Sequence, residues 1–219
     1  MHSVKNEGEL YTRRNACDRG AQTKMLYETL LVLELTHRIA NDWTCAFATI
    51  SELARRSSSP TVKSTLSKLS SHLMRQAELM QTLIPDSETN HDAAIYLERV
   101  CLAISRTRLE ELNIHLVFAA EPIAMAANCC LRLGMIVCEL LTNSARNAFS
   151  DHRGGTIRVE LCRRGLIAEC RVSDTGCARP NSDAGYGFAI ARELIASLGG
   201  SIDQELGPSG STSILQLPL

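Results

Sequence analysis

The sequence has few aromatic residues, no large net charge and no long apolar segment. Phe, Trp and Tyr make up 4% of its 219 residues, and 23 Lys plus Arg face 24 Asp plus Glu, a formal charge of −1. Nucleic-acid binding needs a basic surface, and single-strand binding also needs aromatic rings, so neither is expected. The chain contains no apolar run long enough to span a membrane and no signal-like N-terminus, which predicts a cytoplasmic protein.

Cysteine is plentiful, but its spacing carries no pattern. The nine cysteines are odd in number and include no Cys-x-x-Cys pair, whereas disulfide frameworks need pairs and zinc sites need closely spaced ligands. Cys101, Cys138 and Cys170 lie within apolar runs, where a thiol packs as a small hydrophobic residue. Reduced thiols are therefore expected, and a zinc site is not.

Periodicity divides the chain into three parts. Residues 1–23 show none and are interpreted as a flexible N-terminal arm. Residues 24–85 form a hairpin of two long helices, separated near Ser59 because the following proline disfavours helical geometry there. After a polar linker, residues 91–219 mix helical and strand patterns, which favours an α+β domain with helices over one face of a mixed sheet.

Each helix of the hairpin carries an apolar stripe. The stripes consist of Leu35, Ile39, Trp43, Ala46, Ile50 and Leu53, and of Val62, Leu66, Leu69, Leu73, Ala77, Met80 and Ile84. A two-helix hairpin leaves part of this surface open to water. A second copy would close it as a four-helix bundle, so we expect a homodimer through the hairpin. Packing of the hairpin against the chain's own second half is the alternative.

His37 lies on the face of its helix opposite Leu35 and Ile39. Glu34 and Asn41, at i−3 and i+4, share this outward face. The arrangement suits an imidazole that reacts with a group arriving from outside, although a solvated surface histidine would look the same from this segment alone.

Polar residues also gather on one side of an apolar helix in the second half. Glu139, Asn143, Arg146 and Asn147 stand at i, i+4, i+7 and i+8. A carboxylate and an amide oxygen so placed can hold Mg²⁺ with its water shell, and a guanidinium can bind phosphate. The alternative is a solvated polar face.

Two glycine-containing segments follow. Asp174 ends a strand two residues before Gly176, where a carboxylate could accept a hydrogen bond from the adenine amine; an ordinary turn is the alternative. Gly185 and Gly187 open a helix, where phosphate could approach backbone N–H groups.

The order and spacing of these motifs resemble the ATP-binding domain of the histidine kinases, within the wider family shared with gyrase, Hsp90 and MutL. The first motif, from Glu139 to Phe149, resembles the bacterial HWE or HisKA_2 subgroup. His37, Arg38 and Asn41 match the His-Arg-x-x-Asn motif of that subgroup, and the absence of a Trp-x-Glu signature favours the HisKA_2 type. The resemblance covers about residues 25–219 and implies a Bergerat-type α/β sandwich after the hairpin.

The resemblance also implies roles for individual residues. His37 would be the phosphoacceptor, with Glu34 or Asn41 orienting its ring. Asn143 would bind Mg²⁺, with Glu139 as a nearby base, and Asp174 would bind adenine. The remaining positions implied to shape the nucleotide pocket or contact phosphate are Arg146, Asn147, Gly176, Gly185, Gly187 and Thr212.

The implied function is a two-component histidine kinase that uses ATP and Mg²⁺, phosphorylates His37, and passes the group to an aspartate of a response-regulator receiver. Its input would come from a separate sensor partner, the N-terminal arm or a larger protein. The family's Asp-x-Gly-x-Gly motif has lost its second glycine at Ala178, which leaves other interpretations open. These are a histidine phosphotransferase or receiver phosphatase with a degenerate ATP domain, and a non-catalytic dimeric module that sequesters a regulator.

Overall fold

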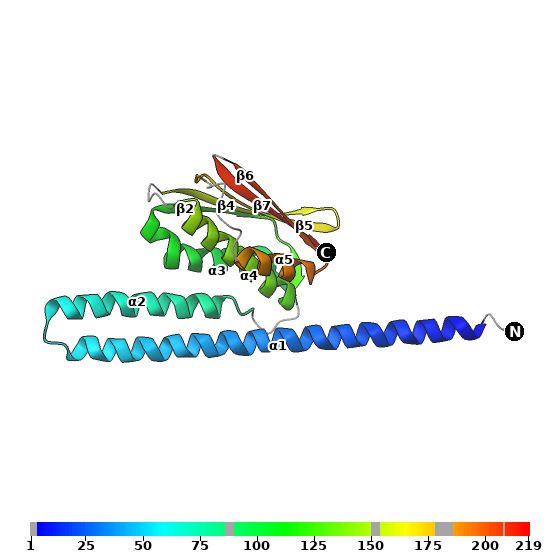
Figure 1. Cartoon of the computed structure of the whole chain (residues 1–219), viewed down its shortest axis with the longest axis horizontal. Coiled ribbons are helices and arrows are strands. Elements are labelled where there is room, and N and C mark those ends of the chain that lie inside the picture. Colours follow the sequence, from blue (N-terminus) through cyan, green and yellow to red (C-terminus); the bar gives the residue numbers. More distant parts are fainter. Residues whose placement is uncertain (1–3, 86–89, 150–153, 178–185, 208) are drawn as a thin grey trace.

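The computed structural model describes residues 4–85, 90–149, 154–177, 186–207 and 209–219, with side chains from Leu30 onward except Tyr186. A long helical hairpin lies along one side of a domain in which three helices cover a five-stranded sheet (Figure 1). The helices lie between the sheet and the hairpin. The expected α+β fold is therefore confirmed.

The hairpin consists of α1 (Val4–Arg56) and α2 (Pro60–Thr82). Ser59 caps α2 by accepting a hydrogen bond from the Val62 N–H, and Pro60 occupies the first turn, where no N–H is needed. Small side chains line the contact between the helices: Ala40 and Ala54 are buried, and the Ser51 and Ser70 hydroxyl oxygens lie 2.6 Å apart. None of the described helices is long and apolar enough to cross a membrane.

The start of α1 differs from our expectation of a flexible arm over residues 1–23. The helix is continuous from Val4, and residues 1–3 lie outside the described part. Two glycines, Gly8 and Gly20, suggested a loose segment, but each costs a helix interior only about 1 kcal/mol relative to alanine. No proline interrupts the segment, and extending an existing helix needs no new nucleation.

The apolar stripe of α1 lies outside the hairpin. Leu35 and Leu53 are 57% and 52% exposed, and Ile39 and Trp43 are also exposed. Val62 and Leu69 of α2 are exposed as well. Leu73 of α2 is buried and Ile50 of α1 is half-buried, so only part of each apolar stripe is exposed in the described hairpin.

The second part of the chain begins with β1 (Asn90–Asp92) and α3 (Ala93–Ile104), followed by a π-helical turn (Ser105–Leu109) and a 3₁₀ turn (Glu110–Leu112). The remaining elements are β2 (Ile114–Ala120), β3 (Ala124–Ala126), α4 (Ala127–Asn147), β4 (Gly155–Arg164), β5 (Ile167–Asp174), α5 (Tyr186–Ala196), β6 (Ser201–Gly207) and β7 (Gly210–Pro218). The large sheet has the order β2-β4-β5-β7-β6; β2 and β4 are parallel and the other pairs antiparallel. The short β1–β3 pair was not predicted.

Alternation along the strands sets which side chains meet the helices. On β5, Ala168, Cys170, Val172 and Asp174 are buried, and on β7, Ser213, Leu215 and Leu217 are buried. Val172 pairs with Ser213 in the β5–β7 register. A polar side chain at the end of this buried row, Asp174, is therefore held between the sheet and the helices.

The end of α2 packs into the core of the second domain. Leu79 and Leu83 are buried with α3 and α4 residues in one cluster. The Tyr96 hydroxyl of α3 donates a hydrogen bond to the Leu83 carbonyl (2.9 Å), and a Cβ at Gly134 of α4 would collide with the Tyr96 ring. The end of α2 therefore shares a hydrophobic core with residues of the second part of the chain.

The buried thiols predict a loss of stability at alkaline pH. No disulfide links the cysteines whose side chains the structure describes. Burial raises the pKa of Cys101 to about 12 and that of Cys138 to about 11, from 9.0 for a free thiol. Folding favours the neutral thiols, so their contribution is complete below pH 9 and is lost as the pH rises toward 11–12. Urea unfolding should show stability falling from about pH 8 to about pH 10.5, less steeply in Cys101→Ala. A flat profile would contradict this.

Candidate functional site

Asp174 is the centre of a hydrogen-bond cradle between three elements. Its carboxylate Oδ1 accepts from the backbone N–H of Gly176 (3.1 Å) and Ser211 (3.2 Å). Oδ2 accepts from the hydroxyls of Ser144 on α4 (2.9 Å) and Ser211 on β7 (2.5 Å). Asp174 is only 7% exposed. Four donors match the capacity of one carboxylate, so the charge is fixed in position before any ligand arrives.

The structure places Ser211, rather than Thr212, beside Asp174. Thr212 pairs with Ser173 across the β5–β7 ladder. Because side chains alternate between sheet faces, Thr212 points to the face opposite Asp174. The polar side chain of the last strand that meets the carboxylate is therefore one residue earlier than the position predicted from sequence.

Two glycines allow the backbone to close around Asp174. A Cβ at Gly176 would collide with the backbone carbonyl of Ala148, at the end of α4. Gly210 has φ +139°, and a Cβ there would collide with the carbonyl oxygen of Asp174. The turn after β5 is also joined to α4 by the Cys177 N–H, which donates to the Ala148 carbonyl (3.0 Å). Larger residues at positions 176 and 210 would open the cradle.

The polar face predicted on α4 is present next to this cradle. Glu139, Asn143 and Asn147 are partly exposed and Arg146 is exposed. The Arg146 Nη2 donates to the Asn143 Oδ1 (3.2 Å). Ser144, directly after Asn143, turns to Asp174. One helix thus carries both the group that meets the carboxylate and the polar face on which phosphate chemistry was predicted.

Gly187 brings the first turn of α5 against the Glu139 side chain. A Cβ at Gly187 would overlap the Glu139 carboxylate. The N-terminal turn of a helix exposes N–H groups and a partial positive charge, which attract anions. In this structure the Glu139 carboxylate lies at that turn. Gly185, the other predicted glycine, lies outside the described residues.

The donor set around Asn143 fits a magnesium ion held chiefly through a bound phosphate. No group of three or more His, Cys, Asp or Glu within the described ranges is arranged to hold a metal ion. Mg²⁺ typically takes one or two protein oxygens and completes its shell with phosphate oxygens and water. Asn143 Oδ1 supplies such an oxygen once the exposed Arg146 side chain turns away.

The predicted phosphoacceptor lies on a solvent-facing part of α1. His37 and Asn41 are exposed. Glu34, which was predicted to orient the imidazole, instead accepts a hydrogen bond from the Arg38 Nε (2.8 Å), in an ion pair one turn along the helix. No hydrogen bond to the His37 ring is found among the described residues. The imidazole is therefore accessible and is not held by Glu34.

His37 is not next to the cradle in this arrangement. Val32 of α1 lines a groove of ≈ 210 Å³ with residues of α4 and α5, including Leu131 and Ser197. Five residues along a helix turn the side chain by about 140°, so His37 faces away from the side that meets the domain. Arg132 bonds Ser197 at this end of the helices, and Glu139 is about 10 Å further along α4.

Two residues of the site were not predicted: Ser144 and Ser211. Each follows a predicted or structurally required residue, Asn143 and Gly210 respectively. Serine is common in turns and near helix ends, so neither residue stands out in the sequence. The register of β5 against β7 and the rotation of α4 bring both hydroxyls to one carboxylate.

The second half of the chain is similar in sequence to known proteins. Residues 130–219 match the family described as histidine kinase-, DNA gyrase B- and HSP90-like ATPase. A curated relative, blue-light-activated histidine kinase 2 of Erythrobacter litoralis, is 28% identical over 134 residues, which cover 57% of this chain and 37% of that protein. The chain thus matches little more than a third of the length of that relative.

Two solved structures share the fold over most of both chains. The histidine kinase domain of an Erythrobacter litoralis blue-light-activated kinase is 22% identical, with a TM-score of 0.57, covering 80% of this chain and 96% of its own. A bacterial phosphotransferase is 12% identical, with a TM-score of 0.56, covering 86% and 95%. At these identities the likeness concerns the fold. Residues 130–219 are therefore similar to the histidine kinase-, DNA gyrase B- and HSP90-like ATPase family, and the chain shares its fold with a solved histidine kinase domain.

Proposed function

We propose that this chain is an ATP-dependent protein-histidine kinase that phosphorylates His37 and passes the phosphoryl group to an aspartate of a response-regulator receiver. The observation that carries the proposal is the cradle: a buried carboxylate beside a polar α4 face, which in turn meets the first turn of α5. Such a site could bind the adenine ring of a nucleotide at Asp174 and its phosphates at the first turn of α5. The cytoplasm, where ATP and receivers are present, is the proposed location.

In the proposed reaction Asp174 binds the adenine amine, which requires one of the serine hydroxyls to turn aside. Asn143 would hold Mg²⁺, which would offset charge on the phosphates. A ring nitrogen of His37 attacks the γ-phosphorus in line, a P–N bond forms, and the bond to the β–γ bridging oxygen breaks so that ADP leaves. Glu139 lies where it can accept a proton near the phosphates, and Arg146 where it can bind them.

Autophosphorylation within one chain requires the domain to move relative to α1, because His37 faces away from it. The receiver then attacks phosphohistidine with an aspartate oxygen, which regenerates the free imidazole. The test is a chase experiment: protein labelled from γ-labelled ATP should lose its label to a purified receiver, and Asn143→Ala should remain unlabelled by ATP. If Asn143→Ala labelled at the native rate, the assignment of the magnesium position would be wrong.

One observation favours a second candidate, a histidine phosphotransferase. The end of α2 is built into the core of the ATP domain through Leu79, Leu83 and Tyr96, which resists the movement that autophosphorylation needs. A phosphotransferase would exchange phosphoryl groups between His37 and receivers without ATP. Labelling of His37 from a phosphorylated receiver, in a protein that binds no ATP, would support this candidate instead.

We also propose that the chain is a homodimer through the hairpin. Leu35, Ile39, Trp43 and Leu53 of α1 are exposed, as are Val62 and Leu69 of α2, and a second copy would bury these side chains in a four-helix bundle. Ile39→Glu should convert the dimer to a monomer, as measured by light scattering. Ala48→Glu, on the opposite exposed face of α1, is the matched control and should remain dimeric. An Ile39→Glu dimer of native stability would exclude this interface.

A further inference from the structure

A second polar site lies between the hairpin and the ATP domain, away from the cradle. A groove of ≈ 220 Å³ is bordered by α2 on one side and by α3 and the π-helical turn on the other. Its lining includes three arginines, Arg75, Arg99 and Arg106, and one carboxylate, Glu78. The remaining lining residues are Thr82, Leu102, Ala103 and Thr107. The balance of charge among the lining residues favours an anion.

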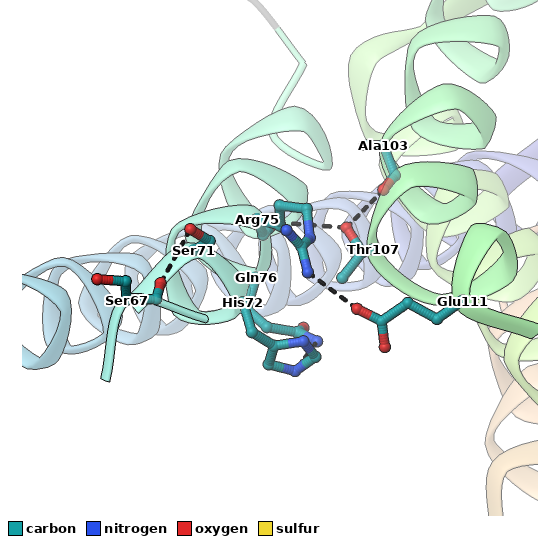
Figure 2. A network of polar contacts seen from close by, with 8 residues as sticks. All are labelled: Ser67, Ser71, His72, Arg75, Gln76, Ala103, Thr107 and Glu111. Carbon is teal, nitrogen blue, oxygen red and sulfur yellow. Dashed lines mark hydrogen bonds and ion pairs between the residues drawn. The ribbon is translucent and has the colours of Figure 1, made fainter. Parts of the chain in front are cut away.

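Arg75 connects the two sides of this groove (Figure 2). Its Nη2 donates to the Glu111 Oε1 at 3.1 Å. The buried Thr107 hydroxyl donates to the Ala103 carbonyl at 2.6 Å, with a longer contact of 3.5 Å to the Arg75 carbonyl. Arg75 thus contacts the π-helical turn through its backbone carbonyl, which meets Thr107. Its guanidinium contacts Glu111, in the 3₁₀ turn that follows. Arg75 is therefore held in place at the junction rather than solvated as a free surface side chain.

The Arg75 Nε is buried and has no hydrogen-bond partner within the described part of the chain. A buried guanidinium N–H without an acceptor is unfavourable, because the group has lost its water and gained no partner. Glu111 accepts a hydrogen bond from the Nη2 of Arg75 and not from its Nε. Arg75, which lines the groove, therefore keeps one donor that the described residues leave unmet.

We propose that this groove binds a small, multiply charged oxyanion that bridges α2 and the ATP domain. Arg75 and Arg106 would bind it from the two sides. Arg99 also lines the groove and would add to the local positive charge. Guanidinium groups bind phosphate and carboxylate oxygens in a bidentate manner, so both a phosphoryl compound and a polycarboxylate have the required chemistry.

Such a ligand would act at the junction through which the hairpin and the ATP domain are joined. Arg75 lies two turns before Leu83, whose carbonyl bonds Tyr96. An anion that holds Arg75 and Arg106 together would stabilise the arrangement in which His37 faces away from the domain. The site is thus suited to an effector that restrains phosphorylation of His37. This regulatory role rests on the proposed function, whereas binding of the anion does not.

The test is calorimetric titration of the whole chain with inorganic pyrophosphate and, separately, with citrate, at constant ionic strength. Binding should weaken by about tenfold or more in Arg106→Gln. Arg158→Gln, at an exposed position on the outer face of the sheet, is the matched control and should bind as the native protein does. The ligand whose binding weakens in Arg106→Gln shows whether the site prefers a phosphoryl compound or a carboxylate. Binding of neither, or equal binding by Arg106→Gln, would overturn the proposal.

ATP binding by the same variants separates this proposal from the proposed function. Arg106→Gln should bind ATP with native affinity, because Arg106 lies outside the cradle. A chain that fails to bind ATP yet binds pyrophosphate or citrate through Arg106 would refute the kinase and retain the anion site.

Discussion

Asp174→Asn is expected to remain folded while binding ATP about 30-fold more weakly, because a charged acceptor for the adenine amine is replaced by a neutral one. The asparagine oxygen can still accept from the Gly176 and Ser211 N–H groups, and the Ser144 and Ser211 hydroxyls can turn to accept from its amide. Equilibrium binding of ATP and thermal unfolding of the same samples would measure both effects.

Asp174→Ala should behave differently, since it leaves the two backbone N–H groups buried and unpartnered. Roughly 2 to 6 kcal/mol of folding free energy would be lost for the pair. Thr212→Val is the matched control: the residue lies on the opposite face of β7, and the variant should bind ATP normally. Native ATP affinity in Asp174→Asn, or a strong defect in Thr212→Val, would show that the nucleotide is bound elsewhere.

Gly187→Ala is expected to reduce autophosphorylation by about 100-fold with little change in the midpoint of thermal unfolding. The added methyl group would occupy the position of the Glu139 carboxylate. That group is the end of a flexible side chain, so it can turn away at small cost to folding. The displaced carboxylate would no longer lie at the start of α5, and the methyl group would obstruct the approach of phosphate. The rate of label incorporation from γ-labelled ATP measures the effect.

Gly176→Ala provides the contrast. Its methyl group would meet the rigid backbone of Ala148 rather than a side chain, so stability and activity should fall together. Should Gly187→Ala retain the native rate, Glu139 and the first turn of α5 would have no part in the reaction.

Much of this fold could be predicted from local patterns. The apolar helix that carries Glu139 and Asn143 and the strand that ends at Asp174 depend on near neighbours, and the structure contains both, as α4 and β5. The three-residue strands β1 and β3 were missed because segments so short carry no periodicity. The apolar stripe of α1 could be recognised from its spacing. The contact with α2 could not, because small residues of α1 such as Ala40 and Ala54 are buried there.

The site was predictable in its main residues and not in its partners. Asp174, Asn143 and Glu139 stand out because polar side chains interrupt apolar elements. Ser144 and Ser211 do not, since their role depends on strand register and helix rotation, which act between distant segments. The one-residue difference between Thr212 and Ser211 has the same origin. Glu34 has two possible partners on one exposed helix face, His37 at i+3 and Arg38 at i+4. It pairs with Arg38, which the sequence pattern alone did not predict.

The measurement that tests the central claim most directly is incubation of the native chain and of His37→Ala with Mg²⁺ and γ-labelled ATP. We expect a label on the native protein that is lost in acid and stable in base, as for phosphohistidine, and no label on His37→Ala. An equally labelled His37→Ala protein would contradict the phosphoacceptor. An unlabelled native protein would contradict the kinase.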